Sequence, residues 1–197
     1  PTFALRLAAV AKEMGVNLED SSINYTMHAG EPGPTALPAM KKEILEAWGA
    51  QNAGELLGIA EIDAFAPCNS IGDGVHVDEM SVYSWVIDPE TGKEVSEGEI
   101  GEHVVTSYTN GTQPLLNYRT HDLVRPRYSC PSGRTWLKFE GSVLGRTDFM
   151  ITLRGTNVYP TAVENILGDI DGVSSNYELH MTQDQGNDEM EIKFEPE

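Results

Sequence analysis

The chain has 197 residues, of which 40% are hydrophobic and 22% charged, a composition typical of a globular protein with a sizeable core. Acidic residues outnumber basic ones by 31 to 13, which gives a formal charge of −18 at pH 7. Because such a charge repels nucleic acid and anionic lipid, the composition argues against a nucleic-acid-binding protein and against a membrane-surface protein.

Neither the cysteines nor the apolar runs indicate secretion or a membrane span. The two cysteines, Cys68 and Cys130, are too few and too far apart for a disulfide framework. No run approaches the roughly 20 apolar residues that a spanning helix needs, and no signal peptide is recognisable. A cytoplasmic location is therefore expected. The chain starts with Pro1 rather than Met, which suggests a segment of a longer protein.

The first third of the chain predicts helices alternating with a strand. Apolar residues at helical spacing, followed by Gly15, indicate a first helix, and a second amphipathic stretch ends before Gly49. Between them, a β-rich stretch runs into a turn rich in glycine and proline. The expected helices span 1–14 and 38–48, the strand 22–27 and the turn 28–34. This succession predicts an α/β layer up to about residue 72.

Beyond residue 72, short β-rich runs are separated by turns. The runs lie at 75–77, 82–87, 103–108 and 115–118. The clearest turn is Asp88-Pro-Glu-Thr-Gly92, because Pro fixes φ and Gly accepts a positive φ. A β-rich subdomain is therefore predicted over 73–147.

The last part of the chain predicts a smaller unit. A helix is expected at 161–167, begun at Pro160, with strands near 177–181 and 190–194. The whole sequence therefore predicts a mixed α/β fold, of the α+β kind, with a β-rich middle part.

Four short motifs, three of which contain glycine, carry polar or charged residues, and each is common by itself. They are Gly30-Glu31-Pro32, Leu57-Gly-Ile-Ala-Glu61, Tyr118-Arg-Thr-His-Asp122 and Gly145-Arg-Thr-Asp148. In this order, and together with the segments at 114–123 and 153–160, they resemble the phenylacetate-CoA ligase family of acyl-adenylate-forming enzymes. The resemblance covers essentially the whole chain. It implies that residues 1–147 are the C-terminal part of a large AMP-binding domain and that the small C-terminal domain starts at residue 149.

The resemblance implies a nucleotide site built from three places in the chain. Asp122 matches the family's ribose-binding aspartate, and a carboxylate can accept both hydrogen bonds of a cis-diol. Arg146 would donate to ribose and phosphate oxygens. The Gly30-Glu31-Pro32 turn matches the loop on the adenine side, where a tight turn lets the backbone approach the flat base.

The resemblance also implies a magnesium ligand and a hinge, at the two residues expected to take part in catalysis. Glu61 matches the carboxylate that binds Mg²⁺ beside the phosphates, a hard ligand for a hard cation. In the same motif, the family has an aromatic residue and a hydroxyl residue where this chain has Leu57 and Ala60. A stacking partner for adenine and a phosphate donor are therefore missing. Asp148 matches the hinge about which the small domain rotates.

Cys68, His76 and Cys130 suggest a separate, structural zinc site, since thiolates and imidazole suit this metal. Some relatives have a cysteine where Ser132 stands, so the fourth ligand would be water or a neighbouring residue. The alternative is a pair of buried free thiols. The other histidines, among them His121, are interpreted as structural or surface residues.

The function that the resemblance implies is that of an AMP-forming carboxylate–CoA ligase. A carboxylic acid, expected to be aromatic, attacks ATP to give an acyl-adenylate, and coenzyme A then displaces AMP. The expected cofactors are ATP/AMP, Mg²⁺ and coenzyme A, with Zn²⁺ as a structural option. Two alternatives stay open. One is a relative that adenylylates another acceptor or forms an amide, and the other is a non-catalytic fragment or scaffold, alone or as a homodimer.

Two catalytic parts of the family are not found in the sequence. There is no Ser/Thr/Gly-rich phosphate-binding loop ending in Lys, and the only lysine after Asp148 is Lys193. The chain by itself is therefore expected to be inactive, although weak AMP binding could survive.

Overall fold

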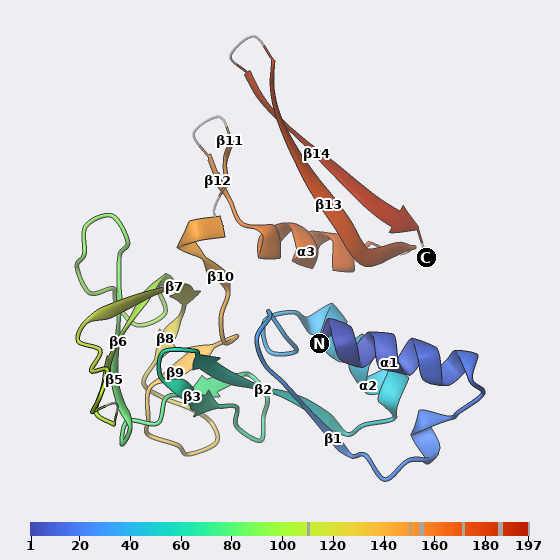
Figure 1. Cartoon of the computed structure of the whole chain (residues 1–197), viewed down its shortest axis with the longest axis horizontal. Coiled ribbons are helices and arrows are strands. Elements are labelled where there is room, and N and C mark those ends of the chain that lie inside the picture. Colours follow the sequence, from blue (N-terminus) through green and yellow to red (C-terminus); the bar gives the residue numbers. More distant parts are fainter. Residues whose placement is uncertain (110, 150, 154–155, 171, 185–186, 197) are drawn as a thin grey trace.

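The computed structural model describes residues 1–109, 111–149, 151–153, 156–170, 172–184 and 187–196. Its elements fall into three groups that follow one another along the chain (Figure 1). The mixed α/β class predicted from the sequence is confirmed. No helix of the described residues is long and apolar enough to cross a membrane.

The first group is a three-stranded sheet with two helices. Its elements are α1 (Thr2–Glu13), the 3-10 turn η1 (Leu18–Asp20), β1 (Tyr25–His28), α2 (Pro38–Trp48), β2 (Asn52–Ile59) and β3 (Asp63–Pro67). The strand order is β1-β2-β3, with β1 parallel and β3 antiparallel to β2. Parallel neighbours need a crossover, which α2 provides. Proline in the first turn favours the start of α2, and Gly49, with a φ of 62°, ends it in the left-handed conformation that glycine adopts without strain.

Helix α2 joins the sheet to α1. Its buried residues Met40 and Ile44 form a small core with Ala53 of β2. On the α1 side, the indole Nε1 of Trp48 donates to the backbone oxygen of Ala4 at 3.1 Å. Both helices predicted in this part of the sequence are therefore confirmed, and their apolar faces pack as the periodicity indicated.

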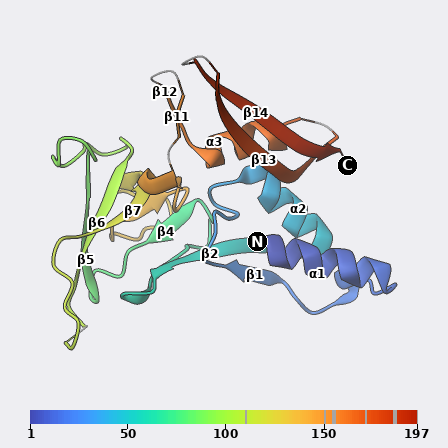
Figure 2. The same ribbon diagram turned by 45° about the horizontal axis from the view of Figure 1, so that its top comes forward.

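The second group consists of two antiparallel sheets. Its strands are β4 (Gly74–His76), β5 (Val82–Ile87), β6 (Gly101–Ser107), β7 (Tyr118–Val124), β8 (Pro126–Arg127), β9 (Lys138–Glu140) and β10 (Gly145–Arg146). One sheet has the order β10-β7-β6-β5 and the other β4-β9-β8. Figure 2 shows β5, β6 and β7 side by side, away from α1 and α2.

The main hydrophobic core lies between these strands and reaches into the first group. Phe139 and Val105 are completely buried in it, and Leu57 of β2 and Phe65 of β3 belong to the same cluster. The first two groups therefore share one core. The division of the chain near residues 72 and 147 stays a prediction.

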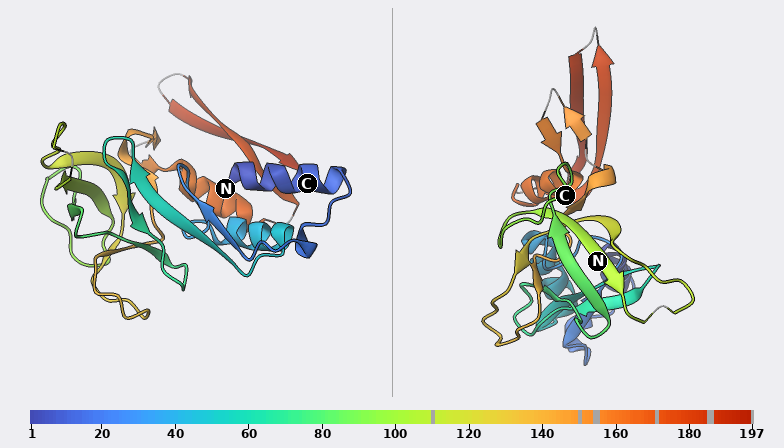
Figure 3. Two further views of the ribbon diagram at one scale, coloured as in Figure 1. Left: turned by 60° about the horizontal axis from the view of Figure 1, so that its bottom comes forward. Right: turned by 90° about the vertical axis from the view of Figure 1, so that its left-hand side faces the viewer.

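The third group follows β10. Its elements are the 3-10 turn η2 (Thr147–Phe149), β11 (Ile151–Leu153), β12 (Thr156–Val158), α3 (Pro160–Gly168), β13 (Val173–Asp184) and β14 (Asn187–Pro196). The antiparallel hairpin β13–β14 projects from the rest of the chain (Figure 3). Helix α3 lies close to α2, because a Cβ atom added to Gly168 would lie 3.0 Å from the Cβ atom of Ala39. This contact places the C-terminal end of α3 against the first turn of α2.

Candidate functional site

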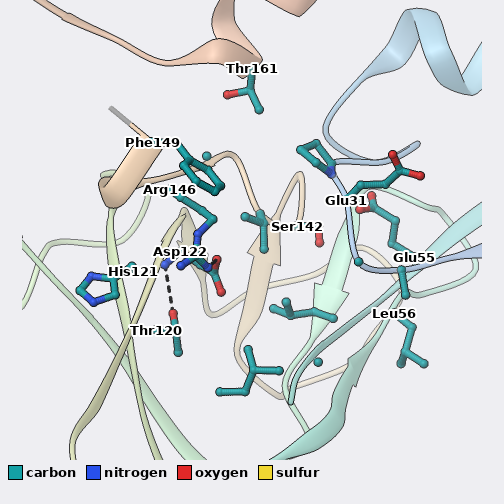
Figure 4. Close-up of a pocket in the computed structure, with 18 of the residues that line it drawn as sticks. Glu31, Glu55, Leu56, Thr120, His121, Asp122, Ser142, Arg146, Phe149 and Thr161 are labelled. Atoms are coloured by element: carbon teal, nitrogen blue, oxygen red, sulfur yellow. Dashed lines mark hydrogen bonds and ion pairs between the residues drawn. The ribbon is translucent and has the colours of Figure 1, made fainter. Parts of the chain in front are cut away.

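A cavity of about 610 Å³ lies where the three groups meet (Figure 4). Residues 29–32 and strand β2 line one side, β7 and β10 line the other, and the N-terminal half of α3 contributes Pro160, Thr161 and Glu164. The residues predicted to contact nucleotide or magnesium all line it, namely Gly30, Glu31, Pro32, Glu61, Asp122 and Arg146. The structure therefore brings together residues from four distant sequence motifs.

Asp122 and Arg146 form the centre of one wall. They lie opposite each other in the register of β7 and β10, and Arg146 Nη1 donates to Asp122 Oδ1 at 2.8 Å. Asp122 is nearly completely buried; burial raises its pKa, and the Arg146 guanidinium acts against that rise. A carboxylate has about four lone-pair sites, so Asp122 keeps acceptor capacity for the hydroxyl groups of a ligand.

Arg146 also binds Asp148, the residue predicted at the hinge. Its Nε and Nη2 donate to the two carboxylate oxygens of Asp148 at 2.8 and 2.7 Å, a bidentate pair. This pair lowers the pKa of Asp148. The Phe149 ring centre lies 5.5 Å from the guanidinium carbon. One side chain of β10 therefore connects buried Asp122 to the turn η2, where the third group begins.

Glu61 lies in the turn after β2 and lines the cavity. The hydroxyl of Tyr118 donates to Glu61 Oε1 at 2.7 Å, and this bond lowers the pKa of Glu61. Glu61 is thus an ionised carboxylate in a fixed position. Leu57 and Ala60 line the same stretch, and Leu57 also belongs to the main core.

The turn at residues 30–32 is fixed by contacts with the start of α1. Gly30 has a φ of 84°, which permits the tight turn. Glu31 accepts hydrogen bonds from the hydroxyl of Thr2 at 2.9 and 3.0 Å and from the backbone nitrogen of Thr2 at 3.0 Å. Burial raises the pKa of Glu31, and the hydrogen bonds from Thr2 act against this rise. The Glu31 carboxylate is therefore occupied by α1, and the cavity is bordered by the backbone of the turn.

Comparison with known proteins identifies the fold around this site. Residues 155–197 match the family described as AMP-binding enzyme C-terminal domain. Over 199 residues, the chain is 35% identical to phenylacetate-coenzyme A ligase of Thermus thermophilus, and the match covers 99% of the chain. The chain belongs to the phenylacetate-CoA ligase family. It spans 44% of the length of the Thermus ligase.

A solved structure agrees with this family. The chain is 28% identical to 2-hydroxyisobutyryl-CoA ligase in the postadenylation state in complex with 2-HIB-AMP, with a TM-score of 0.90 over 100% of the chain and 42% of the ligase. For the same ligase in complex with 2-HIB-AMP and CoA in the thioesterification state, the TM-score is 0.72, with the same identity and coverage. The chain therefore superposes better on the first of these two structures.

One buried cavity residue of this phenylacetate-CoA ligase homologue was not predicted from the sequence. Glu55 of β2 is 4% exposed and accepts a hydrogen bond of 2.6 Å from the backbone nitrogen of Thr35. Burial raises the pKa of Glu55 to about 7, although Thr35 and the Ser142 side chain act against this rise. A Cβ atom at Gly33 would lie 2.9 Å from the carboxyl group, so the turn after residue 32 packs directly on Glu55. The available signal was the single charge in β2, in which the residues after Asn52 are otherwise apolar.

His121 was interpreted as a structural or surface residue, and it lies at the border of the cavity. Its φ of 66° is in the left-handed region that disfavours side chains with a Cβ. The ring Nδ1 lies 3.2 Å from Thr147 Oγ1 and 3.1 Å from Glu102 Oε1. Glu102 is completely buried and is also paired with Arg119. His121 thus connects β6 to η2.

The zinc site expected at Cys68, His76 and Cys130 is not formed. Among the described residues, no group of three or more His, Cys, Asp or Glu side chains is placed to hold a metal ion. Cys68 lies in the hydrophobic core, with Sγ 2.8 Å from the Tyr25 hydroxyl. Cys68 is paired with Val75 in an antiparallel bridge. Directly opposite residues share a face and successive residues alternate, so His76 faces away from Cys68. The prediction was wrong because it considered only which residue types bind zinc, and not the alternation of side chains between the two faces of a strand.

Proposed function

We propose that the cavity binds the AMP part of an acyl-adenylate and that the protein is an AMP-forming carboxylate–CoA ligase. The observation that carries this proposal is the buried Asp122, paired with Arg146 at 2.8 Å, opposite the turn at residues 30–32 in one cavity. The chain spans less than half the length of the ligases that it matches, so the activity of the whole protein is itself part of the proposal.

In this proposal, each wall of the cavity contacts a different part of AMP. Asp122 accepts hydrogen bonds from the ribose diol, and Arg146 donates to ribose and phosphate oxygens. The adenine lies against the backbone of the Gly30 turn. Because Leu57 and Ala60 offer neither an aromatic ring nor a hydroxyl, adenine binding depends more on this backbone than on stacking.

Glu61 is the residue that would hold Mg²⁺. One carboxylate fits this ion, since Mg²⁺ in phosphate sites is commonly bound by one or two carboxylates together with phosphate oxygens and water. The ion would offset negative charge on the phosphates while the acid attacks the α-phosphate. The bond from Tyr118 keeps Glu61 ionised and oriented for this role.

The acid substrate would lie next to the AMP cavity. A second, more open cavity of about 580 Å³ lies there, and its lining residues are mostly small or apolar: Ala29, Gly30, Leu56, Gly58, Ile59, Ala60, Ile62 and Ala64, with Glu61 and Asp63. An apolar or aromatic acid suits such walls. Its carboxylate would then approach the AMP cavity from the side of Glu61, which lines both cavities. In the second step, the thiol of coenzyme A would attack the acyl-adenylate and displace AMP, which gives the thioester.

The test is AMP binding to the chain, measured by calorimetric titration at low salt. We expect Asp122→Ala to weaken AMP binding by about 1–3 kcal/mol, the usual effect of stranding buried hydrogen-bond partners. The matched control is Asp169→Asn, because Asp169 is exposed after α3 and lies outside the lining of the cavity. Equal affinity of the wild type and Asp122→Ala would contradict the ribose role.

Catalysis provides a second test. We expect no acid-dependent exchange of pyrophosphate into ATP by these residues alone, because the phosphate loop and the late lysine are not in the sequence. Exchange at the rate of a complete ligase would contradict the assignment of these missing parts.

A further inference from the structure

A buried polar cluster lies next to the Cys130 turn and outside both cavities. At its centre is Asn69, which is 2% exposed. The Asn69 amide nitrogen lies 2.8 Å from Asp73 Oδ1, 3.2 Å from His76 Nε2 and 3.4 Å from Cys130 Sγ. One NH₂ group is thus surrounded by a carboxylate oxygen, an imidazole nitrogen and a sulfur.

The surrounding contacts fix what each of these atoms presents to Asn69. His76 Nδ1 lies 3.3 Å from the backbone oxygen of Trp136, which can only accept, so Nδ1 carries the proton and Nε2 offers a lone pair. The other oxygen of Asp73 accepts from the buried ammonium of Lys138 at 2.7 Å. Asp73 and His76 therefore present acceptor atoms to the amide, which has two hydrogens to donate, and Cys130 Sγ is the most distant of its three neighbours at 3.4 Å.

The Asn69 amide is also held from its other end. Its oxygen accepts from the backbone nitrogens of Ile71 and Gly72, both at 2.9 Å. If the side chain moved out of the cluster, the backbone nitrogens of Ile71 and Gly72 would lose this acceptor, which is costly at Gly72 because that residue is buried. The position of the amide is therefore built into the turn that leads to β4.

Oxygen, imidazole nitrogen and sulfur are also the ligand atoms of zinc sites, where they lie about 2.0–2.3 Å from the ion. Here the atom at the centre is an amide nitrogen, at distances typical of hydrogen bonds. The Lys138 ammonium adds a positive charge next to the cluster, which disfavours a further cation. We propose that the Asn69 amide takes the place of a metal ion, so that the junction of residues 69–76 with the Cys130 turn is held by hydrogen bonds and needs no metal. This proposal does not depend on the proposed nucleotide function.

An isosteric substitution distinguishes a junction held by hydrogen bonds from one held by a metal ion. Asn69→Asp keeps the oxygen that caps the turn and replaces the NH₂ group by a second oxygen. The centre of the cluster then has no donor, and four ligand groups surround it. We expect this variant to be less stable than the wild type in chelator and to bind Zn²⁺ or Co²⁺.

The experiment uses thermal unfolding of the wild type and the variant, in EDTA and with added zinc. The wild type is expected to contain no stoichiometric zinc and to keep its Tm in EDTA. Asn69→Asp should have a lower Tm in EDTA, and zinc at 100 times its Kd should raise that Tm by roughly 5–10 °C. With cobalt, the variant should show thiolate-to-metal absorption that the double variant Asn69→Asp, Cys130→Ser lacks.

Two results would overturn the proposal. One is wild-type protein that carries one zinc per chain and loses stability in EDTA, a measurement that does not require the variant to fold. The other is a folded Asn69→Asp variant that binds neither zinc nor cobalt, because the amide would then not occupy a position suited to a metal.

Discussion

Glu55 provides a test of how burial in the cavity affects stability. For an acid whose folded pKa is raised, the folded state binds protons more tightly than the unfolded state, so stability is highest at low pH and falls as pH rises through the folded pKa. The pKa of Glu55 is raised from 4.5 to about 7 by burial. Two-state linkage between these two values gives a loss of about 2–3 kcal/mol between pH 5 and pH 8.

The variant that isolates this effect is Glu55→Gln. Glutamine has the shape of the protonated carboxyl group and keeps an acceptor for the backbone nitrogen of Thr35. Other carboxylates also titrate between pH 5 and pH 8, but they do so in both proteins and cancel in the difference. The wild type should therefore lose about 2–3 kcal/mol relative to Glu55→Gln over this range.

The measurement is urea unfolding of both proteins at several pH values, with Glu46→Gln as a control. Glu46 is exposed on α2, and its substitution should change stability little and equally at every pH. A difference between wild type and Glu55→Gln that does not change with pH would refute the reasoning, because the carboxyl group would then be solvated in the folded state.

Two further predictions concern the positions of single groups. Gly74→Ala should destabilise the fold by at least about 2 kcal/mol in urea unfolding, because Gly74 has a φ of 152° and an added Cβ atom would clash with the backbone oxygen of Phe139. The control is Gly111→Ala, which should be nearly neutral because an added Cβ atom would have nothing within 4 Å. Arg146→Lys should weaken AMP binding about tenfold in calorimetric titration, because a lysine cannot bridge Asp122 and Asp148 while donating to a ligand; unchanged affinity would show that Arg146 only holds the hinge turn.

Local patterns in the sequence predicted the elements, and motifs predicted the main residues of the cavity. Both helices of the first group follow from helical periodicity with glycine after each, and the β-rich middle part follows from short alternating runs. Asp122 and Arg146 lie in separate motifs 24 positions apart, and only the pairing of β7 with β10 makes them neighbours.

The residues that were missed depend on contacts between distant segments. Glu55 stands out as a candidate site residue because the turn near Gly33 packs on its carboxyl group, and no local pattern in the sequence shows that contact. The error at Cys68 has the same origin, since the pairing of residues 68 and 75 decides which side chains share a face. Asn69 was overlooked because an amide is not a typical ligand, although its position decides what the surrounding groups can do.

The hydrogen-bonding capacity of Arg146 limits how a ligand can enter this site. A guanidinium has five N–H donors, and in the part of the chain that the structure describes, three of them are directed at the carboxylates of Asp122 and Asp148. A ligand that needs more than two bonds from Arg146 must therefore detach one carboxylate. The side chain of Asp148 is 43% exposed and that of Asp122 is 7% exposed, so water can compensate the release of Asp148 far better. Occupation of the cavity by a phosphate would thus act first on the turn that joins β10 to the third group.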